Sequence, residues 1–117
     1  MRARQAVRAI CTESGFTLVD QTKMVTAASE LARNTIVHGR GGTLTMESLE
    51  DGTRRGVKLL FEDQGPGIQD TARALQDGYT TGNGMGLGLP GSRRLVNEFE
   101  LVSQLGVGTR VTAVRWR

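Results

Sequence analysis

The pattern of apolar and polar positions predicts two helices in the first part of the chain. Over residues 4–14 the apolar side chains recur at helical spacing, and Gly15 follows as a stop signal. A longer helix is expected from an N-cap at Asp20 to about His38, with Gly39 ending it. The apolar face of this second helix would consist of Met24, Ala27, Ala28, Leu31 and Thr35.

Alternating apolar and polar positions further along predict two β-hairpins. Residues 43–49 and 56–61 form the strands of the first hairpin, and an Asp-Gly pair at residues 51–52 signals the turn between them. Residues 100–105 and 109–116 form a closing hairpin around another glycine-containing turn. Each strand would turn one apolar side toward the helices.

A polar, glycine-rich connection over residues 63–86 separates the hairpins. Connections of this length inside a compact domain are usually functional or disordered. Residues 87–99 then return to helical spacing, with Pro90 in the first turn, where its missing N–H has no partner to lose. This order predicts one α+β domain over residues 1–117, a two-layer sandwich with helices on one face of a mostly antiparallel mixed sheet.

Glycine is unusually abundant in this sequence, and its positions add to the predicted fold a candidate functional loop. The 117 residues include 16 glycines, and half of these fall between Gly65 and Gly91. With only two prolines and no repeat, the excess fits neither a collagen-like chain nor a disordered one. The concentration of glycine therefore indicates a functional loop where the backbone closely approaches another group.

Charge and cysteine content narrow the function classes. The net charge of +3 is spread along the chain, and the few aromatic residues are not interleaved with basic clusters, which argues against nucleic-acid binding. The sequence predicts no membrane span and no signal peptide, so we expect a cytoplasmic protein. The single cysteine, Cys11, lies in the first amphipathic stretch and is expected to be a buried, unreactive thiol.

Three sets of residues are candidates for chemistry, and the first lies on the second predicted helix. Glu30, Asn34 and His38 are spaced four apart, so successive side chains advance by only about 40° and share one face. A carboxylate, an amide and an imidazole in a row offer a base, a metal ligand and a phosphate contact. A solvated helix face would show the same spacing.

The other two sets flank the long connection. A carboxylate at a strand end, as at Asp63, can accept a hydrogen bond from an exocyclic amine, and Gly65 and Gly67 would let a flat ring approach the backbone. A simple turn would explain the same residues. Residues 82–89 (GNGMGLGL) place side-chain-free positions ahead of a helix, where backbone N–H groups bind phosphates. They match neither a Walker loop nor a Rossmann fingerprint, and a lid without a ligand is the alternative.

Together with a late Gly-Thr pair at residues 108–109, these sets resemble the ATP-binding fold shared by gyrase, Hsp90, histidine kinases and MutL, the GHKL superfamily. Within it, SELARNTIVHG at residues 29–39 and the stretch over residues 77–111 are most similar to the anti-sigma-factor kinases, in particular the RsbT-type switch kinases. The resemblance covers nearly the whole chain. Relatives usually carry a further strand before the first helix, whereas this sequence starts almost at that helix. Two alternatives stay open: the start is truncated or misassigned, or the sheet lacks an N-terminal edge strand that a partner could fill.

The resemblance implies a role for each residue near the phosphates. Glu30 matches the general base that deprotonates the protein hydroxyl acceptor, Asn34 matches the ligand that joins Mg²⁺ to the triphosphate, and His38 matches a position near the phosphates. ATP and Mg²⁺ would therefore be the cofactors. The hinge and phosphate-binding segment would consist of Gly84, Gly86, Leu87, Gly88 and Leu89.

The resemblance also implies how adenine would be bound. Asp63 matches the carboxylate that binds the adenine amine, in a pocket shaped by Gly65 and Gly67. Thr109 matches a threonine that supports adenine recognition.

The function implied is that of an ATP- and Mg²⁺-dependent serine/threonine protein kinase of the stress-signalling switch type. Its substrate would be a STAS-domain antagonist or scaffold protein of a stressosome, and its second partner a PP2C-type phosphatase that it activates. Gyrase-like relatives use the same carboxylate to activate water, so Glu30 alone does not establish a kinase. Two alternatives stay open, an anti-sigma factor that sequesters a sigma factor and an inactive nucleotide-binding scaffold.

Overall fold

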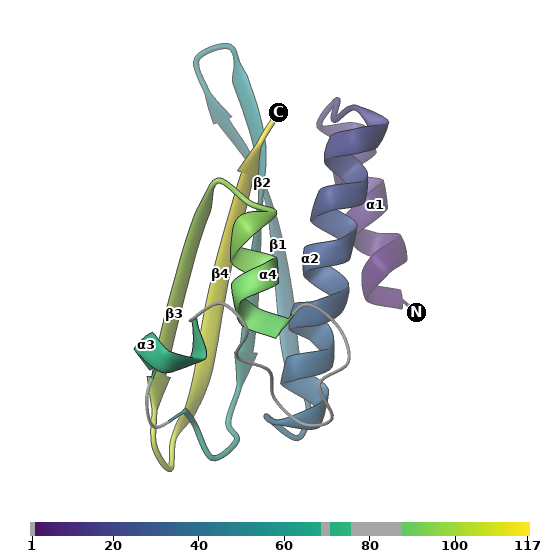
Figure 1. Cartoon of the computed structure of the whole chain (residues 1–117). Helices are drawn as coiled ribbons and strands as arrows, with labels where there is room; N and C mark the ends of the chain where they lie inside the picture. The colour runs from purple at the N-terminus through teal and green to yellow at the C-terminus, as the bar shows by residue number, and fades with distance from the viewer. Residues whose placement is uncertain (1, 69–70, 76–87) are drawn as a thin grey trace.

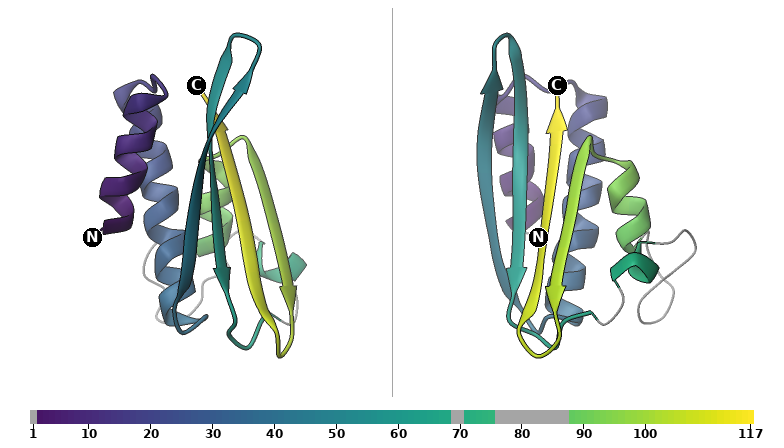
Figure 2. Two further views of the ribbon diagram at one scale, coloured as in Figure 1. Left: turned by 180° about the vertical axis from the view of Figure 1, so that it is seen from behind. Right: turned by 90° about the vertical axis from the view of Figure 1, so that its left-hand side faces the viewer.

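The computed structural model describes residues 2–68, 71–75 and 88–117. The described elements, in chain order, are α1 (Arg2–Glu13), α2 (Leu18–Val37), β1 (Gly42–Asp51), β2 (Arg54–Asp63), α3 (Thr71–Ala74), α4 (Gly88–Arg94), β3 (Glu98–Gln104) and β4 (Gly108–Trp116). Figures 1 and 2 show α1, α2 and α4 together on one side of the sheet, and no helix of the described residues covers its other face. The predicted two-layer α+β sandwich is therefore confirmed.

The sheet has four strands in the order β1-β2-β4-β3, and all pairs of the described strands are antiparallel. Both predicted hairpins are present, as β1–β2 and β3–β4, and the strands of the first hairpin extend further toward their turn than the sequence pattern indicated. Because β4 pairs with β2, the second hairpin lies against the first and places the start of β4 beside the end of β2.

The core lies between this sheet and the helices. From α2 it takes all five residues predicted as the apolar face, Met24, Ala27, Ala28, Leu31 and Thr35, each of which is buried. From α1 come Val7 and Cys11, so the prediction of a buried cysteine is confirmed. The sheet contributes Val57, Leu59 and Phe61 of β2 and Val111 and Ala113 of β4.

At one end of the sheet, polar residues occupy strand positions that point to the same face as the core residues. In β2, Asp63 follows Phe61 by two residues and so points to the helix-covered face. In β4, Thr109 precedes Val111 by two residues and points to the same face. The register pairs Asp63 with Thr109, which brings one carboxylate and one hydroxyl together at the edge of the core.

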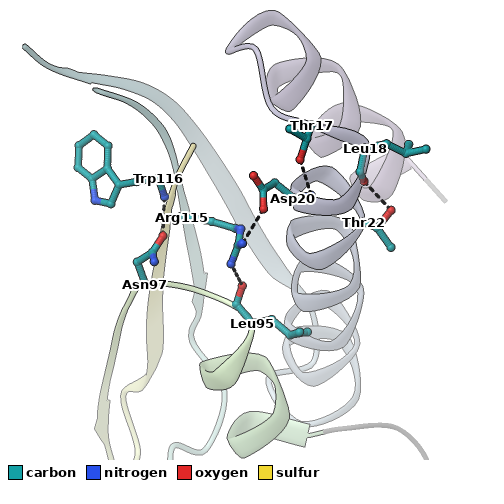
Figure 3. Close-up of polar contacts among 8 residues, drawn as sticks. All are labelled: Thr17, Leu18, Asp20, Thr22, Leu95, Asn97, Arg115 and Trp116. Carbon is teal, nitrogen blue, oxygen red and sulfur yellow. Dashed lines mark hydrogen bonds and ion pairs between the residues drawn. The ribbon is translucent and has the colours of Figure 1, made fainter. Parts of the chain in front are cut away.

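The start of α2 differs from the prediction. The N-cap is Thr17, whose side-chain oxygen accepts a hydrogen bond from the backbone N–H of Asp20 at 3.2 Å (Figure 3). Asp20 lies instead in the first turn of the helix, where a carboxylate is favoured by the helix dipole. Asp20 was wrongly predicted as the cap because Thr and Asp are both strong N-cap residues and lie only three positions apart.

The third predicted helix also ends earlier than expected. α4 stops at Arg94, and Phe99 belongs to β3, where it pairs with Ala113. Asn97 hydrogen-bonds to β4, because its backbone N–H donates to the carbonyl of Val114 at 2.8 Å. The side-chain oxygen of Asn97 accepts from the backbone N–H of Trp116 at 2.6 Å (Figure 3). These long-range bonds end the helix, although the apolar spacing continues.

Within the described residues, no helix is both long enough and apolar enough to span a membrane.

Candidate functional site

A cavity of about 280 Å³ lies between the second half of α2 and the adjoining ends of β2 and β4. Its walls are largely apolar, and a few polar groups face it, as in many ligand pockets. The lining residues are Leu31, Asn34, Thr35, His38, Gly39, Phe61, Asp63, Pro66, Gly67, Ile68, Leu89, Thr109 and Val111.

Asp63 stands at the end of β2 and is held in place by the backbone around it. Its Oδ1 accepts a hydrogen bond from the backbone N–H of Gly65 at 2.9 Å. Gly39, just after α2, packs directly on the carboxyl group, because a Cβ at position 39 would lie only 2.3 Å from Asp63 Cγ. Only glycine fits there, so the glycine that follows α2 also fixes the position of the carboxylate.

Thr109 is held by a second hydroxyl group that sequence analysis missed. Its Oγ1 lies 2.8 Å from the Oγ of Ser103, which points inward from β3. The same Ser103 oxygen accepts from the backbone N–H of Ile68 at 2.7 Å and lies within hydrogen-bond distance, 3.1 Å, of the Gly108 carbonyl. Ser103 therefore ties together two segments that line the cavity. Its inward position follows from the alternation with Phe99 and Leu101, which was the signal available in the sequence.

The loop after β2 closes one side of the cavity and packs on the β3–β4 turn. Gly67 has a φ of +81°, and a Cβ there would lie 2.4 Å from the carbonyl oxygen of Gln104. One residue earlier, the carbonyl of Pro66 accepts from the backbone N–H of Gly106 at 2.9 Å. Both the backbone conformation and the close approach at position 67 require glycine.

The structure brings together most of the site residues that the sequence predicted. Asn34, His38, Asp63, Gly67, Leu89 and Thr109 all line the one cavity. Gly65 adjoins it through its hydrogen bond to Asp63. Their proposed roles stay predictions, because position alone does not show what each residue does.

The remaining predicted residues lie outside the cavity lining or outside the described residues. Glu30 is half-buried on α2, one helical turn before Asn34, and is not among the lining residues. Gly88 is the first residue of α4. Gly84, Gly86 and Leu87 lie outside the described residues. Among the residues that the structure describes, no group of three or more His, Cys, Asp or Glu side chains is placed to hold a metal ion.

Comparison with known proteins shows the family to which this chain belongs. Residues 19–117 match the family described as histidine kinase-, DNA gyrase B- and HSP90-like ATPases, and the chain belongs to this family. A solved structure, described as the mycobacterial sensor histidine kinase MprB, shares the fold with a TM-score of 0.61. It is 20% identical in sequence, and the match covers 82% of this chain and 71% of that one.

Relatives of known function narrow the assignment within the family. The serine/threonine-protein kinase RsbT of Bacillus subtilis (strain 168) is 45% identical over 114 residues, covering 97% of this chain and 86% of the relative. The anti-sigma F factor of Clostridium kluyveri is 30% identical over 115 residues, covering 93% and 80% of the two chains. The anti-sigma F factor of Thermoanaerobacter sp. (strain X514) is 28% identical over 120 residues, covering 97% and 82%. The chain is thus a member of the RsbT-type serine/threonine kinases of this ATPase family.

Proposed function

We propose that this chain is an ATP- and Mg²⁺-dependent serine/threonine protein kinase of the stress-signalling switch type. The observation that carries the proposal is the pairing of Asp63 with Thr109 at the edge of an apolar cavity that also takes in Asn34 and His38 from α2. This arrangement has the recognition groups of a nucleotide site at one end and polar helix residues at the other.

The adenine end of the nucleotide fits the cavity. An exocyclic amine is a hydrogen-bond donor, and Asp63 supplies the acceptor while the hydroxyl of Thr109 supplies a second polar contact. Leu31, Phe61 and Val111 provide apolar walls for a flat ring. The volume of about 280 Å³ is close to the lower end of ligand pockets, about 300–1,000 Å³, and suits a heterocycle better than a whole triphosphate.

The phosphate end would lie toward the polar residues of α2. Asn34 offers an amide oxygen, a ligand type that Mg²⁺ accepts, and His38 stands exposed at the rim of the cavity. Mg²⁺ usually takes only one or two protein ligands beside phosphate oxygens and water, so a site without a carboxylate cluster fits it. When bound, ATP would supply the phosphoryl group and Mg²⁺ would offset the negative charge of the phosphates. Gly84, Gly86, Leu87, Gly88 and Leu89 are proposed to adjoin the phosphates.

Glu30 is proposed as the general base of the reaction. A kinase base must accept a proton from a hydroxyl on another protein, so it has to be reachable from outside the closed adenine cavity. Glu30 meets this condition, because it lies on α2 one turn before Asn34, is only half-buried and does not line the cavity. The carboxylate would accept the proton of the serine or threonine hydroxyl as the oxygen attacks.

The proposed protein substrate is a STAS-domain antagonist or scaffold protein, the second proposed partner is a PP2C-type phosphatase, and the proposed location is the cytoplasm. These assignments are supported by the similarity to RsbT. A second candidate function is sequestration of a sigma factor with kinase activity secondary, which the similarity to anti-sigma F factors favours.

Phosphoryl transfer from labelled ATP to a purified STAS-domain partner tests the proposal. Wild type should label the partner, Glu30→Gln should lower the rate about 100-fold or more, and Asn34→Ala should also lower it. Glu47→Gln, a carboxylate removed from an exposed position of β1, is the matched control and should keep the wild-type rate. Equal labelling by all variants would contradict the roles of Glu30 and Asn34. Tight binding of a sigma factor without phosphoryl transfer would favour the second candidate.

A further inference from the structure

A partly buried arginine links the end of α4 to the start of α2, away from the residues that line the cavity. Arg115, near the end of β4, donates a hydrogen bond to the carboxylate of Asp20 at 2.7 Å and another to the backbone carbonyl of Leu95 at 2.9 Å. The Arg115 side chain is 15% exposed and the Asp20 side chain 22% exposed. Figure 3 shows the guanidinium group between the first turn of α2 and the residue that follows α4. We call Asp20, Arg115 and Leu95 the Arg115 cluster.

The Arg115 cluster holds one end of a short helix whose other end reaches the cavity. α4 runs from Gly88 to Arg94, so it is about 10 Å long, and it packs against α2. Leu89, in its first turn, is buried and lines the cavity. Leu95 immediately follows its last turn. Because α4 packs against α2 in a close-packed interior that transmits strain, we expect a shift at Leu95 to displace Leu89 as well.

The geometry requires arginine and not merely a positive charge. The guanidinium group presents several N–H donors in a fixed plane, so Arg115 bonds a carboxylate with one nitrogen and a backbone carbonyl with another. A lysine ammonium is a compact point charge and lacks this planar fork. The cation also lies beside a carbonyl at the C-terminal end of a helix, where positive charge is favoured.

We propose that Arg115 is a positioning residue of the nucleotide site, which acts by fixing the end of α4 and, through it, the wall of the cavity at Leu89. The proposal rests on the proposed function, because it assumes that the cavity binds ATP. It goes beyond that function in assigning a determinant of ATP affinity to a residue that does not line the cavity.

The alternative role for the Arg115 cluster is purely structural. The free energy of unfolding and the ATP dissociation constant together distinguish this role from a positioning role. A structural ion pair contributes to the free energy of unfolding but leaves the ATP dissociation constant of the folded protein unchanged. A positioning residue changes that dissociation constant even where the protein is fully folded. Val7→Ala provides a control for stability alone, because Val7 is fully buried on α1 and does not line the cavity.

The experiment is calorimetric titration of the full chain with Mg²⁺-ATP well below the midpoint of thermal unfolding. We expect Arg115→Met and Arg115→Lys each to weaken ATP binding about tenfold. Asp20→Asn, which keeps an acceptor for one bond, should weaken it less. Val7→Ala should bind ATP within about twofold of wild type although it unfolds at lower urea. Removal of the exposed Arg55–Glu50 ion pair, whose charged atoms are 3.8 Å apart, should change neither the ATP dissociation constant nor the free energy of unfolding.

ATP affinity equal to wild type in Arg115→Lys and Asp20→Asn would overturn the proposal and leave the Arg115 cluster a structural role. These two variants decide the question if Arg115→Met does not fold. Absence of ATP binding by wild type is a different result, since it would contradict the proposed function itself and the inference along with it.

Discussion

Asp63 and Thr109 are direct cross-strand partners in β2 and β4, and both side chains reach the same cavity. Both therefore belong to the rigid sheet and not to a loop, which fixes their separation before any ligand binds. Ser103 holds Thr109 from the neighbouring strand, and Gly39 and Gly65 hold Asp63 from the segments around it. The polar end of the cavity is thus preorganised by backbone pairing.

Replacing Thr109 by valine removes the hydroxyl and keeps the shape of the side chain. We expect ATP affinity to fall about fivefold, the effect of one neutral hydrogen bond, and the free energy of unfolding to fall by about 1 kcal/mol because the bond to Ser103 is lost as well. Calorimetric titration measures the first quantity and urea unfolding the second. Thr112→Val is the control, because the alternation of β4 places Thr112 on the opposite face of the sheet. A fivefold loss in the Thr112 variant as well would remove the argument for Thr109.

Gly67→Ala should destabilise the fold more than Gly106→Ala, although both glycines have similar positive φ values of +81° and +77°. At Gly106 a Cβ would meet nothing within 4 Å, so alanine costs about 1 kcal/mol of backbone strain. At Gly67 the Cβ would lie 2.4 Å from the carbonyl oxygen of Gln104, which raises the cost to about 3 kcal/mol. Urea unfolding of the two variants checks the difference, and equal losses would show that crowding at Gly67 does not matter.

Stability should depend on pH through Asp20. The hydrogen bond from Arg115 is the main cause that holds the pKa of the Asp20 carboxyl below its ordinary value. A carboxyl whose pKa is lower in the folded state stabilises the protein above its unfolded pKa of about 3.9, and this stability is lost as the pH falls through the folded pKa. Wild type should therefore exceed Asp20→Asn by about 1 kcal/mol at pH 7, and the two should converge in strong acid.

Urea unfolding of both proteins from pH 7 down to about pH 2 measures this convergence, because the folded pKa of Asp20 lies below its ordinary value. Asp51→Asn, at the exposed turn of the β1–β2 hairpin, controls for the loss of a carboxylate. A constant difference between wild type and Asp20→Asn across the whole range would show that the Asp20 carboxyl does not titrate as described.

Cys11 should be unreactive in the folded protein. Burial raises the pKa of its thiol to about 11, although the nearby Arg8 acts in the opposite direction, and the side chain is fully buried. The thiolate that reacts with disulfide reagents is therefore scarce near neutral pH, and the reagent has no access. An aromatic disulfide reagent at pH 7.5 should label Cys11 only at the rate at which the protein unfolds, so labelling should accelerate with urea. Rapid labelling without urea would contradict the buried position.

The parts of the fold that sequence patterns predicted depend on short-range periodicity. The apolar face of α2 and the two hairpins follow from spacings of three to four residues or of two residues, which the sequence displays directly. The same periodicity placed Asn34 and His38 on one helix face, and Asp63 at a strand end, where the structure also has them. The placement of these residues near one another was therefore predictable from positions along single elements, together with the resemblance to a family, while their roles stay predictions.

The parts that sequence patterns missed depend on contacts between distant residues. α4 ends early because Asn97 forms hydrogen bonds with Val114 and Trp116 of β4. The pattern of residues 87–99 alone does not predict these bonds, because both partners lie further along the chain. Ser103 is part of the site only because β3 pairs with β4, and Gly39 only because the segment after α2 packs against the end of β2. Asp20 was assigned to capping, whereas its main partner is Arg115, 95 positions further along the chain.

Asp63 is the residue on which adenine binding in this cavity depends most, and Asp63→Asn tests its role directly. Asparagine can keep the carbonyl acceptor for the Gly65 N–H, but its amide then presents a donor toward the amine of adenine where the carboxylate presents an acceptor. Replacement of such a charged acceptor corresponds to a loss of about 10- to 100-fold in affinity. Glu62→Gln, the exposed neighbour on the opposite face of β2, is the control.

Calorimetric titration with Mg²⁺-ATP is the decisive measurement. Wild type and Glu62→Gln should bind ATP with the same affinity, and Asp63→Asn should bind at least tenfold more weakly while its free energy of unfolding stays close to that of wild type. Wild-type ATP affinity in Asp63→Asn would contradict the assignment of this cavity as the nucleotide site.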